Sequence, residues 1–333
     1  MAAHGNPGSR AARALVVFLC ETRAWELTAT SFREHVLEPL DADLALCVAN
    51  NSREVPNPYY EWARFTWQID EPADWADLLT AESGGRDDWR RLEGLDESFL
   101  GGTGTGAERT PGSGAIIMFF RRLLRQELAG RGLADEYDWF IITRSDFLWL
   151  VPHVPLDLLD QSSIYIFDGE HYGGVTDRYA AIPADLIHDF LTIPDPIFDS
   201  PDDLCMRLRA VMAASGGLMN PEIFIATRLR EIGLWDRVRW LPYCAFSVRT
   251  AQGHTSWSGG TFDQAHGFFV KYPEELARSR ALARAVRTED DWRVLFAPVR
   301  GLAKRQVLAL RLWYALRMPK PWRRLLSAAR REA

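Results

Sequence analysis

Residues 14–50 read "ALVVFLCETRAWELTATSFREHVLEPLDADLALCVAN", and this stretch decides the fold class. Its ends, "ALVVFLC" and "ADLALCVAN", are short apolar runs without alternation, a pattern typical of strands that are buried on both faces. A stretch with helical character lies between them and ends near Pro39. A strand, a helix and a second strand at this spacing predict a βαβ unit, and therefore a mostly parallel sheet with helices on both faces.

The chain continues this α/β pattern to about residue 250. Further strands are predicted in "YDWFIITRSD", "SSIYIFDGEHYGG", "DRYAAIP" and the late pair "RVRWLPYCAFSVRT". Helices are predicted in "GAIIMFFRRLLRQELAGRG", "ADLIHDFLTI", "SPDDLCMRLRAVMAAS" and "NPEIFIATRLREIG", the last of them with Asn220 as its N-cap. We expect a flexible leader over residues 1–13, one catalytic domain over residues 14–270, and a basic, helical C-terminal extension over residues 271–333.

Residues 51–111 give a weaker signal. The glycine-rich segment "GGTGTGAERTPGSG" contains a spacing found in dinucleotide-binding loops, but such a loop must directly follow a strand, and this one follows "LDESFL". We therefore interpret it as a mobile surface loop. Neither the phosphate-binding P-loop motif nor the serine nucleophile-elbow motif occurs, which disfavours P-loop kinases, sulfotransferases and α/β-hydrolases.

The composition is that of a globular protein. Of the 333 residues, 47% are hydrophobic and 25% are charged, and the formal net charge is −6. Basic side chains are concentrated after Gly301, so the rest of the chain is acidic, which argues against a nucleic acid as partner. The basic, apolar tail predicts either a helix lying on an anionic membrane surface or a helix packed on the acidic body.

The cysteines and the apolar runs bear on localisation. Four scattered cysteines without a paired motif predict reduced thiols in a cytoplasmic protein. No apolar run reaches the roughly 18 residues that a membrane span needs. We therefore expect a cytoplasmic protein, either free or held at the inner face of a membrane.

Polar side chains follow four of the predicted strands. In open parallel sheets, ligands bind at the carboxyl ends of the strands, near the point where the strand order reverses. The sequence therefore predicts one shared cleft at these strand ends. The residues are Glu21, Thr22 and Arg23 after the first strand, Asn50 and Asn51 after the second, Arg144 and Asp146 after the third, and Asp168 and Glu170 after the fourth.

Arg144 and Asp146 lie one residue apart at the end of an apolar strand. An aspartate there offers a hard oxygen ligand to Mg²⁺ or Mn²⁺, and an arginine binds phosphate as a planar fork. The same two residues can instead form a structural salt bridge. The residues alone leave both interpretations open.

Three blocks in this order resemble a known family: "YDWFIITRSDFLW", "DGEHYGGVTDRYAAIP" and "NPEIFIATRL". "ITRSDF" looks like the Arg-x-Asp form of the Asp-x-Asp motif of GT-A-fold nucleotide-sugar glycosyltransferases. The wider arrangement is similar to the WavE-type lipopolysaccharide-synthesis proteins and related glycosyltransferase-like proteins. The resemblance covers residues 14–250 loosely and residues 137–229 best.

This resemblance implies a GT-A-like fold and a metal-dependent glycosyltransferase. Its substrates would be a nucleotide-diphosphate sugar as donor and a cell-surface glycan or lipid-linked molecule as acceptor. The alternative is a non-catalytic relative that binds glycan or scaffolds an assembly at a membrane. The two hypotheses differ in the effect of Asp146→Ala, which should abolish metal-assisted nucleotide binding only in the enzyme.

The resemblance also implies roles for individual residues. Asp146 would hold the Mn²⁺ or Mg²⁺ that bridges the diphosphate, while Thr22 and Arg23 would face the base and ribose of the donor. Arg144 stands in place of the first aspartate of the family motif. That departure leaves the metal requirement open, since a guanidinium group can do part of the same work.

The block "DGEHYGGVTDRYAAIP" offers a cluster of sugar-binding groups. Asp177 is predicted to act on the donor sugar or its diphosphate, with Asp168 and Arg178 as further donor-binding residues. Gly173 and Gly174 would let the backbone approach a ligand closely. A polar hairpin with a surface Asp–Arg pair is the alternative.

Glu222 and His254 complete the predicted site. Glu222 lies in the first turn of a predicted helix, whose N-terminus should lower the pKa of the carboxyl group. It is either a helix-capping charge or the base that deprotonates the acceptor hydroxyl. His254 follows the last predicted strand, where it is either a late metal ligand or a solvated loop histidine.

Overall fold

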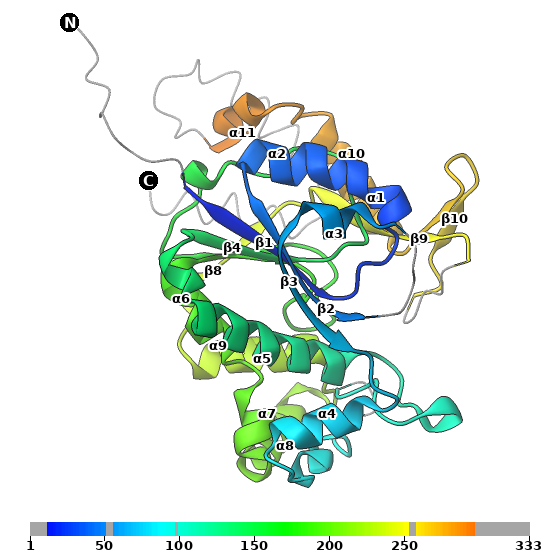
Figure 1. The fold of residues 1–333 in the computed structure, drawn as a ribbon, viewed down its shortest axis with the longest axis vertical. Helices are drawn as coiled ribbons and strands as arrows, with labels where there is room; N and C mark the ends of the chain where they lie inside the picture. The colour runs from blue at the N-terminus through cyan, green and yellow to red at the C-terminus, as the bar shows by residue number, and fades with distance from the viewer. Residues whose placement is uncertain (1–11, 51–55, 97–98, 253–257, 297–333) are drawn as a thin grey trace, which may run out of the picture.

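The computed structural model describes residues 12–50, 56–96, 99–252 and 258–296. Its centre is a seven-stranded sheet with the order β3-β2-β1-β4-β7-β6-β8 (Figure 1). β7 pairs antiparallel with both of its neighbours, and all other pairs in this sheet are parallel. The predicted mixed α/β fold with a mostly parallel sheet is confirmed. The strands are β1 (Ala14–Cys20), β2 (Asp43–Asn50), β3 (Ala63–Asp70), β4 (Trp139–Thr143), β6 (Ile164–Phe167), β7 (Ala180–Pro183) and β8 (Val238–Leu241).

A second, antiparallel sheet has the order β10-β11-β9-β5. Its strands are β5 (Phe147–Trp149), β9 (Ala245–Thr250), β10 (Thr261–Asp263) and β11 (Phe268–Val270). Only residues 144–146 separate β4 in the first sheet from β5 in the second. The chain therefore crosses between the two sheets at the Arg-x-Asp segment.

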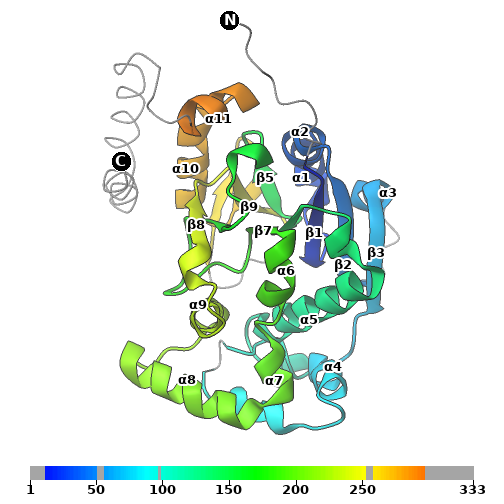
Figure 2. The ribbon, with the colours of Figure 1, turned by 90° about the vertical axis from the view of Figure 1, so that its left-hand side faces the viewer.

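Helices cover both faces of the large sheet. In Figures 1 and 2, α1, α2, α10 and α11 lie on one side, α5, α6 and α9 lie on the other, and α4, α7 and α8 form a further group beyond α5. The bounds are α1 (Trp25–Phe32), α2 (Glu38–Leu40), α3 (Pro58–Trp62), α4 (Trp75–Glu82), α5 (Gly114–Arg131), α6 (Ala184–Leu191), α7 (Asp195–Asp199), α8 (Pro201–Ser215), α9 (Pro221–Glu231), α10 (Pro273–Ala283) and α11 (Glu289–Phe296). A π-helical turn (Arg33–Leu37) joins α1 to α2.

β1 shows why the apolar strands need helices on both faces. Leu15 and Val17 belong to the core that includes the residues of α5 and α9. Val16 and Phe18 belong to the opposite core, which contains residues of α1, α10 and α11. Because successive side chains of a strand point to opposite faces, a strand buried on both sides has no polar alternation.

Two helix ends follow directly from the sequence. The side chain of Asn220 accepts a hydrogen bond from the backbone N–H of Ile223 at 2.8 Å, so the predicted N-cap of α9 is confirmed. α5 ends at Gly132, which adopts the left-handed conformation (φ +64°) that glycine tolerates best.

Residues 271–296, the first part of the predicted C-terminal extension, pack on the sheets. The hydroxyl of Ser279 in α10 donates to the backbone carbonyl of Ala245 at 2.8 Å. Trp292 in α11 is buried, and its Nε1 donates to the carbonyl of Pro152 at 2.8 Å. The predicted leader over residues 1–11 and the basic tail over residues 297–333 lie outside the described residues.

Within the described residues, no helix combines the length and the apolar character that a membrane crossing needs.

Candidate functional site

A cavity of about 410 Å³ lies at the edge of the large sheet where β1 and β4 end. Because β7 runs antiparallel to β4, the residues that immediately precede β7 lie at this same edge. The cavity collects side chains from seven segments of the chain that lie far apart in the sequence. Its charged lining comprises the six cations Arg23, Arg109, Arg144, Arg178, Arg249 and Lys271 and the three acids Glu21, Asp177 and Glu222.

Asp146 lies below this cavity, in a smaller recess that shares several lining residues with it. Its side chain is fully buried. Arg144 donates to both of its oxygens, from Nε to Oδ1 and from Nη2 to Oδ2, each at 2.8 Å. Arg249 contacts Oδ2 through Nη1, and the Nε of Arg23 lies 3.7 Å from the same oxygen. The salt-bridge interpretation of the Arg-x-Asp segment is therefore confirmed, although the pair adjoins the cavity.

The geometry of Asp146 follows from the crossing between the two sheets. β5 begins directly after Asp146 and pairs with β9, so the backbone N–H of Val248 donates to the carbonyl of Asp146 at 2.9 Å. Arg249 is the next residue of β9 and reaches the carboxylate from there. Although burial by itself raises the pKa of Asp146, the guanidinium groups of Arg144 and Arg249 hold it well below its usual range.

This arrangement does not fit the predicted metal ligand. Both carboxylate oxygens of Asp146 accept hydrogen bonds from arginines. A metal ion at either oxygen would be repelled by three nearby guanidinium groups. Among the described residues, no group of three or more histidines, cysteines, aspartates and glutamates is placed to hold a metal ion. His254, the second predicted metal ligand, lies outside those residues.

Lys271 adds a further cation next to the arginines. It follows β11 directly, and it is only 6% exposed. Within the described residues its ammonium group forms no ion pair with a carboxylate, and its Nζ lies 5.2 Å from the centroid of the Tyr272 ring. Burial, together with repulsion by Arg144 and Arg249, lowers the pKa of Lys271 to about 7.

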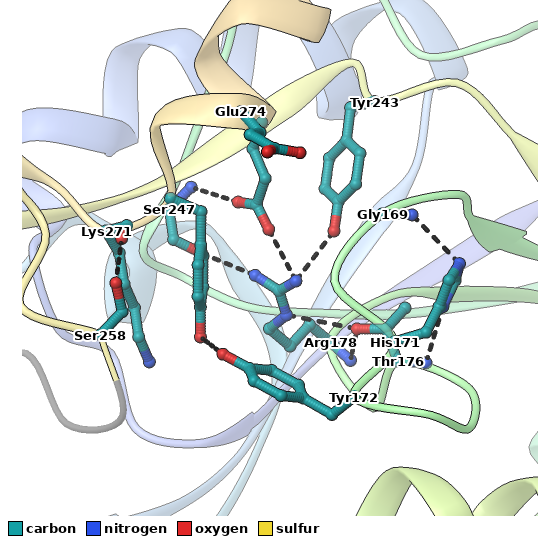
Figure 3. A network of polar contacts seen from close by, with 12 residues as sticks. Gly169, His171, Tyr172, Thr176, Arg178, Tyr243, Ser247, Ser258, Lys271 and Glu274 are labelled. Carbon is teal, nitrogen blue, oxygen red and sulfur yellow. Dashed lines mark hydrogen bonds and ion pairs between the residues drawn. The ribbon is translucent and has the colours of Figure 1, made fainter. Parts of the chain in front are cut away.

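Arg178 has a structural partner of its own. Its Nη2 lies 2.6 Å from Oε1 of Glu275 and donates to the hydroxyl of Tyr243 at 2.9 Å, and its Nε donates to Thr176 at 3.2 Å. Figure 3 shows this guanidinium at the centre of the network, with Tyr172 and Lys271 nearby. Arg178 lines the cavity as predicted, but the buried Glu275 already balances its charge.

Asp177 and Glu222 both line the cavity, so the two predicted catalytic carboxylates are brought into one site. The backbone N–H of Val175 donates to the carbonyl of Glu222 at 3.0 Å. A Cβ on Gly174 would lie 2.0 Å from that same carbonyl oxygen. Gly174 therefore lets its loop approach the start of α9, rather than a ligand as the sequence had suggested.

The pKa of Glu222 is shifted in the direction opposite to the prediction. Burial and, to a smaller extent, the neighbouring charge of Asp177 together raise it to about 8. The favourable effect of the helix N-terminus is thus outweighed by loss of solvent and by a second carboxylate. A carboxyl group with such a pKa can hold a proton or release it near neutral pH, which suits acid–base chemistry.

Two predicted donor-binding residues lie away from the cavity lining. The hydroxyl of Thr22 accepts a hydrogen bond from the side chain of Asn57 at 3.0 Å. The carboxylate of Asp168 lies 3.3 Å from Nε2 of His171, and its carbonyl accepts from Arg278 at 2.9 Å. Both side chains hold loops in place, so Arg23, Arg144 and Arg178 are the predicted donor-binding residues that line the cavity.

Sequence reasoning missed Arg249, Lys271 and Tyr272. Arg249 lies in "AFSVRT", an otherwise apolar strand in which a single buried arginine is itself a signal. Lys271 and Tyr272 directly follow "FFV", a run too short to predict as a strand. The rule that ligand-binding residues follow strands would have found them once that strand was known.

The predicted glycine-rich loop also contributes to the site. Its final residues, from Gly112 onward, line the cavity where α5 begins. Thr110 accepts and donates several hydrogen bonds across the loop, for example from the backbone N–H of Gly102 at 3.0 Å.

No protein-family model matches the chain, and no curated protein matches it. Among solved structures, it is similar to the apo form of mouse xyloside xylosyltransferase 1. The sequence identity is 10%, the TM-score is 0.38, and the match covers 69% of this chain and 85% of that one. A likeness at this level is too weak to place the chain in a family.

Proposed function

We propose that the chain is a glycosyltransferase that moves a sugar from a nucleotide-diphosphate donor to a hydroxyl group of a glycan or lipid-linked acceptor. The observation that carries the proposal is the composition of the cavity, in which arginines and a lysine meet the carboxylates Asp177 and Glu222. A cationic surface within an acidic chain selects an anionic ligand. The carboxylates add groups that can bind sugar hydroxyls and move a proton.

The reaction needs both the cations and the carboxylates of this lining. The acceptor oxygen forms a bond to the anomeric carbon while the bond from that carbon to the diphosphate oxygen breaks. Glu222, in its ionised form, takes the proton of the acceptor hydroxyl. The nucleoside diphosphate leaves with the bonding electrons, and the cations of the cavity stabilise its growing negative charge.

The size of the cavity is compatible with this substrate class. Cavities that hold small organic ligands commonly measure about 300–1,000 Å³. Tyr172 and Tyr272 line the cavity, and their hydroxyl groups share a hydrogen bond of 2.8 Å (Figure 3). Aromatic faces of this kind suit a sugar ring or a base.

A screen of nucleotide sugars tests the proposal. The full chain is incubated with each donor, and release of the nucleoside diphosphate is measured, because water can replace the acceptor in many glycosyltransferases. We expect at least one donor to be hydrolysed and Glu222→Gln to lower that rate by about 10²–10⁴-fold. Glu274→Gln is the matched control, since Glu274 is 76% exposed and does not line the cavity.

Two results would contradict the proposal. One is the absence of turnover with every donor, with and without added Mn²⁺. The other is an equal rate for the wild-type chain and the Glu222 variant, which would remove this carboxyl group from the chemistry.

A further inference from the structure

The cations at the end of β4 outnumber the carboxylates that face them. Arg23, Arg144 and Arg249 surround the single carboxylate of Asp146. Arg23 also lies 3.3 Å from Glu21 through its Nε and Oε2 atoms. Lys271 joins these three arginines, and all four basic side chains line the cavity. Counted against Asp146 and Glu21 alone, the arginines leave one positive charge uncompensated, and Lys271 adds a second when it is protonated, as a bound anion would favour. Two is the charge of the diphosphate group of a nucleotide sugar at neutral pH.

These buried cationic groups destabilise the fold as long as no anion is bound beside them. Burial of an unpaired charge costs several kcal/mol unless a partner compensates it. Lys271 has no described carboxylate partner, and the Nε of Arg249 is buried without a hydrogen-bond partner among the described residues. A bound dianion would satisfy both groups.

Asp146 has a different role in this arrangement from the one that the sequence predicted. Its carboxylate holds Arg144 and Arg249 side by side, with both guanidinium groups facing the cavity. A planar guanidinium that is fixed in this way can bind phosphate oxygens with little loss of side-chain entropy. Asp146 is therefore a positioning residue for the arginines.

From these contacts we infer that Arg23, Arg144, Arg249 and Lys271 bind the diphosphate of the ligand directly and make a divalent metal ion unnecessary. The inference rests on the proposed function for the identity of the ligand. It differs from the expectation drawn from the family resemblance, in which a metal held by Asp146 neutralises the leaving group. Here fixed side-chain cations stabilise the charge of the departing diphosphate.

Calorimetric titration of the full chain with inorganic pyrophosphate tests the inference. In excess EDTA we expect measurable binding. Lys271→Gln should weaken this binding by about tenfold, the effect of losing roughly 1.4 kcal/mol of interaction, whereas Lys271→Arg should keep most of it. Arg280→Gln is the matched control, because Arg280 belongs to the neighbouring helix α10, is half exposed, and does not line the cavity.

A second variant separates the two roles of Asp146. If Asp146 positions arginines, Asp146→Asn loosens them but also leaves more positive charge uncompensated, so pyrophosphate should still bind in EDTA, within about tenfold of the wild-type affinity, at a temperature where circular dichroism shows a folded protein. If Asp146 is a metal ligand, binding should require Mn²⁺ and disappear in this variant. The latter result overturns the inference, and so does failure of pyrophosphate to bind under either condition.

The inference and the proposed function fail in different ways. Turnover of a nucleotide sugar that occurs only with Mn²⁺ would support the transferase and overturn the metal-free site. Pyrophosphate binding in EDTA without any turnover would support the cation site and count against the transferase.

Discussion

Replacement of Asp146 by asparagine should destabilise the chain severely, because it removes the counter-charge of three arginines at once. The substitution keeps the size of the side chain. It leaves Arg144 and Arg249 without the carboxylate that accepts their hydrogen bonds. Removal of one partner from a buried ion pair costs about 3–5 kcal/mol, and the full burial of Asp146 places it in that class.

The assay is equilibrium unfolding in guanidinium chloride, followed by tryptophan fluorescence and by circular dichroism. Asp157→Asn is the matched control. Asp157 also receives two hydrogen bonds from a single arginine, Arg293, at 2.6 and 3.1 Å, but its side chain is 59% exposed. Solvent screens an exposed pair, so we expect the unfolding midpoint of this control to stay close to that of the wild-type chain.

Addition of pyrophosphate extends the same experiment. An anion bound among the arginines compensates the charge that asparagine cannot supply, so it should recover part of the lost stability. The reasoning would be refuted if Asp146→Asn and Asp157→Asn unfolded at the same denaturant concentration. That outcome would mean that the buried carboxylate contributes no more than a surface pair.

Three other predictions follow from the site and its supports. Gly174→Ala should destabilise the chain and lower turnover, because its Cβ would lie 2.0 Å from the carbonyl oxygen of Glu222. Gly130 lies near the end of α5 with open space around it, so Gly130→Ala should raise the free energy of unfolding by about 0.5–1 kcal/mol. Thermal melts of both variants check these effects. At saturating donor, where the bound diphosphate keeps Lys271 protonated, turnover should rise with pH up to about 8, since the base form of Glu222 is the active one. A flat profile between pH 6 and 8 under these conditions would exclude Glu222 as the base. Burial lowers the pKa of His153 from 6.5 to about 4. The neutral side chain should therefore contribute about 3 kcal/mol to the free energy of unfolding, fully present above pH 6.5 and lost as the pH falls toward 4. His153→Gln should flatten this pH dependence.

The fold class could be predicted from the sequence because it depends on local patterns. The apolar runs at β1, β2 and β4 have no polar alternation, so burial on both faces was readable without any tertiary information. The second sheet could not be read in this way. β5, β10 and β11 have three residues each, which is too short for a periodic signal, and β5 pairs with β9, which lies far away in the chain.

The candidate site was predicted in part for a related reason. Asp177 and Glu222 were found because polar residues at a strand or helix terminus are conspicuous in the sequence. The burial that raises the pKa of Glu222 depends on a loop that packs against it, and that contact joins residues far apart in the chain. The role of Asp146 was equally out of reach, because its strongest additional partner, Arg249, is separated from it by 103 positions.

The ion pair between Arg178 and Glu275 has a practical consequence for any shortened version of this protein. A fragment that stops at Val270 would retain every strand described for the two sheets and, of the described elements, would lose only the helices α10 and α11. It would nevertheless lack Lys271, and the buried guanidinium of Arg178 would lose its ion-pair partner Glu275. Boundaries chosen from the strands alone would therefore yield a protein that folds poorly or binds nothing, for reasons unrelated to the chemistry under test.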